Sequence, residues 1–262
     1  MPTFSSFDNN NSTQVAQEIN LSDKQSKGLF LTKVFTMMFI CLLITTVVAA
    51  GLGYGFMYLL TSTAVDGVYN ESLFNGMIIT LIVSVIALLV MSFVLPIRFI
   101  RGKKNIIVPL MIYVVLMGIL LSSFTWLFEP VILAESFGIT ALVFGLMALL
   151  GYLSKGKMAG IGVIMMGLLI GAGLLSLVNF FMILGGQISE TNITISWIVS
   201  LAIFAFLMFM TMWDVARINQ IAQRAEHTDN NLVHYCAYIL YSDFIALLVR
   251  VVYYMAIFSR RR

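Results

Sequence analysis

Long apolar runs follow one another along most of this chain, and short polar stretches separate them. A bilayer core about 30 Å thick is crossed by about 20 helical residues, so each long run predicts a membrane-spanning helix. We therefore expect an all-α polytopic membrane protein with seven transmembrane helices. The seven runs cover residues 34–60, 74–97, 106–128, 131–153, 158–184, 195–221 and 232–258.

The first 32 residues differ from the rest of the chain. They are polar, and they lack the apolar run of a signal peptide. We predict a disordered polar tail over residues 1–32 and a seven-helix membrane domain over residues 33–262. Of all residues, 60% are hydrophobic and 10% are charged, against about 25% charged in soluble domains. This composition excludes a soluble class, and we expect no nucleic-acid partner.

Basic residues gather before the first run and in the even-numbered connections. By the positive-inside tendency, the amino terminus and these connections are cytoplasmic. Seven spans then place Arg260, Arg261 and Arg262 outside, whereas a last segment that re-enters would keep them inside. The last run has no Gly or Pro to make such a turn, which favours a full span. The basic residues are Lys24, Lys27, Lys33, Arg98, Arg101, Lys103, Lys104, Lys155, Lys157, Arg217 and Arg224.

Two aspartates lie inside the last two runs, Asp214 in residues 195–221 and Asp243 in residues 232–258. An ionised Asp near the centre of a spanning helix costs about 2.5 to 3.5 kcal/mol, so it normally faces the protein interior or a wet cavity. The two runs share one polar connection. At a rise of about 1.5 Å per residue, the aspartates lie about 10 and 14 Å from the same membrane face. They can meet there, and we expect the last helix inside the bundle.

Two neighbouring carboxyl groups favour a shared proton, because they cannot both ionise cheaply side by side. The pair is therefore a candidate pH sensor on an ion pathway. Its hard oxygens suit Ca²⁺, although a tight site has about six to eight oxygen ligands. We predict a weak, transient calcium site at Asp214 and Asp243, with calcium as the transported ion and no cofactor. A structural hydrogen bond between the helices is the alternative.

A further acid, Glu135, lies inside the run 131–153, about 6 Å from its outer end. It is either an outer-side carboxylate that attracts cations or a partly hydrated interfacial acid.

Intramembrane aspartyl proteases also use two intramembrane aspartates, one as an acid and one as a base. Their Gly-x-Gly-Asp motif is absent, since Tyr241 and Ser242 precede Asp243, and no Pro-Ala-Leu follows. We therefore predict that the protein is not an enzyme.

Four stretches are informative together: 118–123 (GILLSS), 135–144 (ESFGITALVF), the Trp213-Asp214 segment and 240–245 (LYSDFI). With these stretches the chain resembles a prokaryotic-type member of the transmembrane Bax-inhibitor-motif family, also called the Bax inhibitor family. Two differences stand beside the aspartates. Family members usually have Asn three residues after the last-helix Asp, where this chain has Ala246, and Tyr before the other Asp, where it has Trp213.

The resemblance implies a seven-helix fold with the last helix central in the bundle. It also implies a calcium leak governed by protonation of two aspartates, which match Asp214 and Asp243. An arginine at the cytoplasmic end of the second helix would latch the pair, and Arg98 is the match, with Arg101 as the alternative.

The expected function is thus a pH-sensitive calcium leak channel gated by protonation of an intramembrane aspartate pair. The expected location is a bacterial plasma membrane, with a cytoplasmic amino terminus. The expected partners are the lipid bilayer and calcium ions. The alternative is a non-enzymatic regulator that binds other membrane proteins, such as a membrane protease or a component of cell-death or stress responses.

Overall fold

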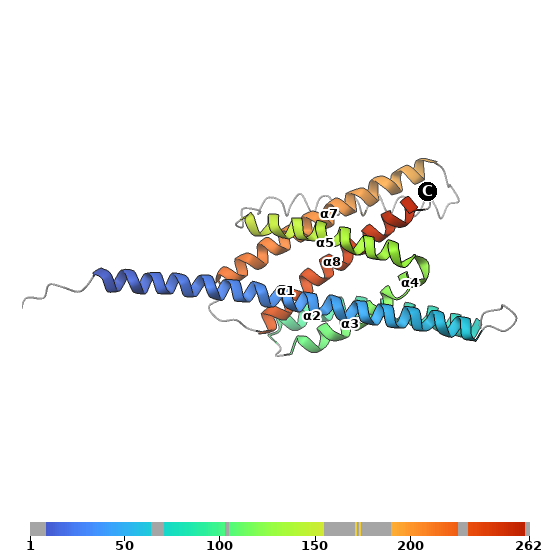
Figure 1. Ribbon diagram of the computed structural model, residues 1–262, viewed down its shortest axis with the longest axis horizontal. Coiled ribbons are helices and arrows are strands. Elements are labelled where there is room, and N and C mark those ends of the chain that lie inside the picture. The colour runs from blue at the N-terminus through green and yellow to red at the C-terminus, as the bar shows by residue number, and fades with distance from the viewer. Residues whose placement is uncertain are drawn as a thin grey trace, which may run out of the picture.

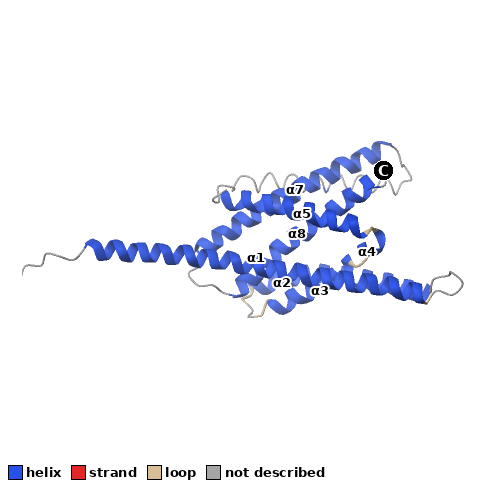
Figure 2. Cartoon of the chain, viewed as in Figure 1, coloured by secondary structure: helices blue, strands red, loops and turns tan. Residues whose placement is uncertain are grey.

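The computed structural model describes residues 9–63, 71–102, 105–154, 171, 173, 190–224 and 230–259. All elements in this part of the chain are helices (Figures 1 and 2). They comprise six stretches long and apolar enough to cross a membrane, so the membrane-spanning helical class is confirmed. The predicted run 158–184 falls outside the described residues, apart from Gly171 and Gly173. The helices are α1 (Asn9–Ser62), α2 (Glu71–Ile100), α3 (Ile107–Leu121), α4 (Phe124–Leu127), α5 (Pro130–Leu153), α7 (Glu190–Arg224) and α8 (Asn230–Ser259).

Helix α1 begins earlier than the sequence predicts. Residues 1–32 were expected to form a disordered tail, but the structure shows one continuous helix from Asn9 to Ser62. This stretch contains no proline, and a single Gly28 in its polar part is not enough to end a helix. Adding turns to an existing helix is also much easier than nucleating a new one. The part of α1 able to cross a membrane starts at Gly28.

The predicted run 106–128 divides into α3 and α4. Ser122 and Ser123 form the turn between them, and their hydroxyls donate to the carbonyls of Ile119 and Leu120 over 2.6 and 2.7 Å. Such local hydrogen bonds compete with a regular helix. Pro130 then occupies the first turn of α5, and the residue before it adopts an extended conformation, as proline requires.

Helix α8 runs obliquely through the bundle between α1 on one side and the α5–α7 pair on the other (Figure 1). It is unbroken from Asn230 to Ser259, so these residues contain no re-entrant turn. Half of its apolar window is buried, compared with 17 to 39% in the other five spanning stretches. Its buried apolar side chains recur at helical spacing, which lets one helix contact several neighbours. They include Cys236, Ala237, Leu240, Tyr241, Phe244, Ile245, Leu247, Val251 and Val252.

Candidate functional site

The two intramembrane aspartates meet between α7 and α8. These helices run in opposite directions, and the carboxyl end of α8 lies beside the start of α7 (Figure 1). Asp214 lies ten residues before the end of α7, and Asp243 lies thirteen residues after the start of α8. At about 1.5 Å per residue these depths are about 15 and 20 Å. The two side chains lie within hydrogen-bonding distance of each other.

The pair is enclosed by protein. Asp214 is only 5% exposed. The Oδ2 atom of Asp243 is fully buried and has no hydrogen-bond partner among the described residues. One turn further along α8 stands the small apolar Ala246, which offers this carboxyl no polar partner. A buried acceptor without a donor costs about 1 to 3 kcal/mol, so this oxygen favours any arrangement that supplies a proton or a cation.

The charged residue whose field reaches Asp214 is Arg217, one turn further along α7. Its effect on the pair was not predicted from the sequence, although the spacing of three residues on a helix could have indicated it. The guanidinium of Arg217 and the carboxyl of Asp214 also both act on Tyr235 of α8. Arg217 itself is exposed, so its charge acts on Asp214 and Tyr235 from the surface of α7.

The two latch candidates lie at the end of α2. Arg98 is partly buried in the last turn of α2, and Arg101 is exposed just after it. The ring of Phe99 between them stacks on Tyr235 of α8, with centroids 4.1 Å apart and planes inclined by 6°. Through this stack the end of α2 reaches the same tyrosine that lies in the field of Asp214. The structure thus joins the end of α2 to α8 at Tyr235, eight residues before Asp243, by an aromatic contact.

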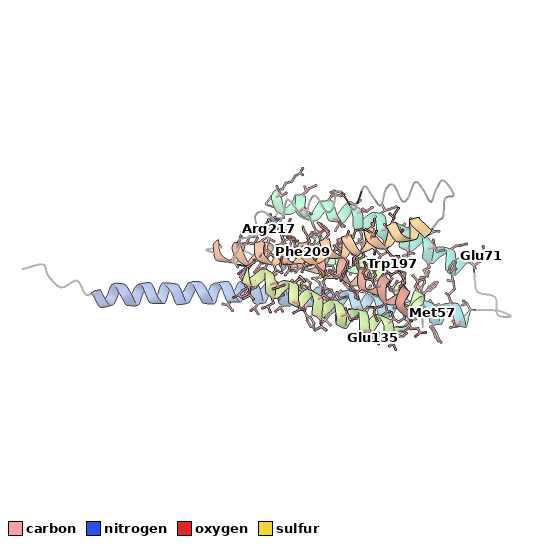
Figure 3. The ribbon with its side chains drawn as sticks, turned by 90° about the horizontal axis from the view of Figure 1, so that it is seen from above. Met57, Glu71, Glu135, Trp197, Phe209 and Arg217 are labelled. Carbon is pink, nitrogen blue, oxygen red and sulfur yellow. The ribbon has the colours of Figure 1, made fainter. Side chains whose placement is uncertain are left out.

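Glu135 lies away from the pair. It is an exposed residue on α5, and it appears in Figure 3 toward the same end of the bundle as Glu71, whereas Arg217 lies toward the opposite end. The side chain therefore sits near the bundle end that holds an acidic residue of α2. Its role as an outer-side acid stays a prediction.

A second polar cluster that the sequence analysis did not predict joins α7 and α8 farther from the pair. Arg250 donates to the Ser200 hydroxyl over 3.4 Å, and the same hydroxyl lies 3.0 Å from the hydroxyl of Tyr254. Arg250 thus contacts the neighbouring helix. The cluster therefore fastens the second half of α8 to the first half of α7.

The neighbourhood of the pair offers oxygen atoms but no preformed metal cage. Among the described residues, no group of three or more His, Cys, Asp or Glu side chains converges. Ser136 and Thr140 on α5 and Thr211 on α7 are fully buried and carry hydroxyl oxygens into the bundle. Two carboxylates with scattered hydroxyls form fewer ligands than the about six to eight that a tight calcium site uses. The arrangement suits transient contact with a cation.

Comparisons with known proteins agree with the membrane fold. The family model described as "Inhibitor of apoptosis-promoting Bax1" matches residues 28–260. The inner membrane protein YbhL of Escherichia coli (strain K12) is 28% identical over 239 residues, which cover 89% of this chain and 92% of that protein. YbhL of Escherichia coli O6:H1 (strain CFT073) matches to the same extent. The matched region contains the six described spanning stretches and both aspartates. The chain is therefore a multi-pass integral membrane protein that belongs to the Bax inhibitor family.

Proposed function

We propose that this protein is a pH-sensitive calcium leak channel, gated by protonation of Asp214 and Asp243. The proposed fold has seven spans with α8 at the centre, a cytoplasmic amino terminus, and the α7–α8 connection on the cytoplasmic side. The observation that carries the proposal is that the carboxyl groups of Asp214 and Asp243, on neighbouring helices, interact with each other inside the bundle. A structural hydrogen bond between helices needs no ionisable pair, since Asn would serve as well.

The pair responds to protons because its two charges repel. When both carboxyls lose their protons, two negative charges face each other in a region with little water. One bound proton relieves that repulsion and gives the second carboxyl a hydrogen-bond donor. The pair consequently titrates as one unit, and its two protons leave in two separate steps that belong to the pair and not to either residue.

The charge on the pair is proposed to hold α2 against α8. At higher pH the ionised pair attracts Arg98 at the end of α2, with Arg101 as the alternative latch, and closes the cytoplasmic end of the path. Protonation removes this attraction, so α2 can move away and calcium flux rises as pH falls. The Phe99–Tyr235 stack supports the closed arrangement, because it joins the end of α2 to the first part of α8.

Calcium is the proposed cargo because its ligands are hard oxygens. A site of two carboxylates binds it weakly, and conduction requires that an ion leave as readily as it enters. At low pH, protons and calcium compete for the same oxygens, which limits the flux. The proposal is for a channel and not for an enzyme.

The test is calcium efflux from vesicles that contain the purified full chain, measured over a range of pH. Asp214→Asn and Asp243→Asn should each abolish the pH dependence about as completely as the double replacement, because either change removes the shared proton. Glu71→Gln is the matched control, since it removes an exposed acid at the start of α2. Arg98→Ala should leak at high pH, where the unchanged protein is quiet.

Four results would contradict the proposal. Additive, independent effects of the two Asp→Asn changes would exclude a shared proton. Flux that declines steadily on acidification would reverse the open and closed states. Closed channels in both Arg98→Ala and Arg101→Ala would exclude the latch. If the parent protein carried no calcium at any pH, the role of a regulator that binds other membrane proteins would be favoured instead.

A further inference from the structure

A small open pocket of about 280 Å³ lies where the first residues of α8 meet α1. The first residues of α8 are at the bundle end opposite the carboxyl end of this helix (Figure 1). Both walls belong to the ends of spanning stretches, since Lys33 lies five residues after the start of the stretch in α1 and Asn230 is the first residue of the stretch in α8. The pocket is therefore at the depth where lipid head groups meet the hydrocarbon core. Its lining consists of Thr32, Lys33, Thr36, Met37, Ile40, Asn230, Val233 and His234.

The pocket lining has a polar part and an apolar part. Lys33 and His234 bring nitrogen donors from the two helices, and hydroxyl and amide groups of Thr32, Thr36 and Asn230 accompany them. No Asp or Glu is among the described lining residues. The positive end of the α8 dipole also lies at Asn230, and it adds to the attraction for an anion. The remaining lining side chains are apolar, and Met37 and Ile40 continue along α1 toward the membrane interior.

We infer that this pocket binds the phosphate of an anionic phospholipid. The polar wall fits a phosphodiester, and the apolar continuation along α1 fits the beginning of an acyl chain. Basic pockets between spanning helices bind acidic lipid head groups in other membrane proteins by the same physics. Lys33 carries a long apolar stem and a terminal ammonium, so it can reach a phosphate from within the helix. A free phosphate ion would use the polar wall alone.

Such a lipid joins α1 to α8 at the start of α8. That start also contacts the α2–α3 connection, because the backbone N–H of Ile106 donates to the Asn231 side chain over 3.5 Å. The first turn of α8 is then held both by the α2–α3 connection and, through the lipid, by α1. This inference does not depend on calcium transport, and lipid binding is measured without any flux.

The experiment measures unfolding of the full chain in detergent micelles to which phosphatidylglycerol or phosphatidylcholine of equal chain length is added. Phosphatidylglycerol should stabilise the unchanged protein and phosphatidylcholine should not. Lys33→Gln should weaken the apparent affinity for phosphatidylglycerol about fivefold, the factor that corresponds to about 1 kcal/mol for one basic residue near an anionic lipid surface. Arg250→Gln is the control, because it also removes one positive charge, twenty residues beyond Asn230 on α8, and it should leave this affinity unchanged.

A second variant keeps the test valid if Lys33→Gln does not fold. Thr36→Leu retains the charge but fills part of the pocket, and it should also weaken phosphatidylglycerol binding. Equal stabilisation by both lipids, equal affinity in Lys33→Gln and the parent, or the same loss in Arg250→Gln would overturn the inference. Stabilisation by inorganic phosphate that competes fully with phosphatidylglycerol would overturn the lipid assignment and leave a phosphate ion site.

Discussion

Replacing Gly151 by alanine should disturb the contact between α5 and α7 that supports Asp214. A β-carbon at Gly151 would lie closer to the backbone carbonyl oxygen of Met212 than van der Waals contact permits, and 3.1 Å from Cβ of Val215. The carbonyl oxygen belongs to the helix backbone, so it cannot rotate away as a flexible side chain would. The two helices must therefore separate at this point, two residues before Asp214.

Two effects of opposite sign determine the size of the change. Alanine stabilises a helix interior by about 0.5 to 1 kcal/mol relative to glycine, because it restricts the unfolded chain. Overpacking of a close contact costs about 1 to 3 kcal/mol. Gly145 on the same helix is a matched control, because a β-carbon there meets open space. Gly151→Ala should therefore be less stable than Gly145→Ala by about 1 to 3 kcal/mol.

The measurement is the free energy of unfolding of both variants in the same detergent, together with calcium efflux against pH. Gly145→Ala should match or exceed the parent in stability and keep its pH profile. Gly151→Ala should be less stable and should show weaker pH dependence, since a displaced Asp214 shares a proton with Asp243 less effectively. Equal stability of the two variants would refute the packing argument, whatever the flux shows.

Two other predictions concern α8. Tyr241→Phe should lower the free energy of unfolding by about 1 kcal/mol, because it removes a buried hydrogen bond of 2.6 Å between the Tyr241 and Thr45 hydroxyls. Adding Thr45→Val to this variant should lower the free energy of unfolding little further. Fully additive effects of the two changes would contradict the contact. Reporter fusions after residue 28 and at residue 262 should report opposite sides of the membrane, since α8 is unbroken. Signals from the same side would contradict the proposed topology.

The helices were predictable where a long apolar run has a clear end. The runs 74–97 and 131–153 correspond to α2 and α5, which extend at most three residues beyond them. The start of α1 at Asn9 was not predictable in the same way, because polar residues can continue a helix that apolar residues have already formed. The division between α3 and α4 depends on two serine hydroxyls, and hydropathy alone does not register hydrogen bonds to the backbone.

The candidate site was partly predictable. Depth along two helices that share a connection was enough to bring Asp214 and Asp243 together, since rise per residue is nearly constant. The rotation of each helix about its axis is not fixed by depth. For that reason the Phe99–Tyr235 stack and the contact of Arg250 with Ser200 became apparent only in the structure.

The helix segments that carry the two aspartates are held in place by α1 and α5. The tight approach of Gly151 fixes α7 two residues before Asp214. The hydroxyl of Tyr241 fixes α8 to α1 two residues before Asp243, and the following Phe244 packs against α5 aromatic rings. Helix α2 takes part in none of these three contacts.

A movement of α2 can therefore break the Phe99–Tyr235 stack while the two carboxyl groups stay together. The proposed mechanism requires that α2 can move without separating the two carboxyl groups. A pair that came apart on opening would lose its shared proton at the moment when that proton is needed to keep the latch released. Rigid support of the pair by α1 and α5, with a movable α2 beside it, lets one protonation state persist through the whole opening step.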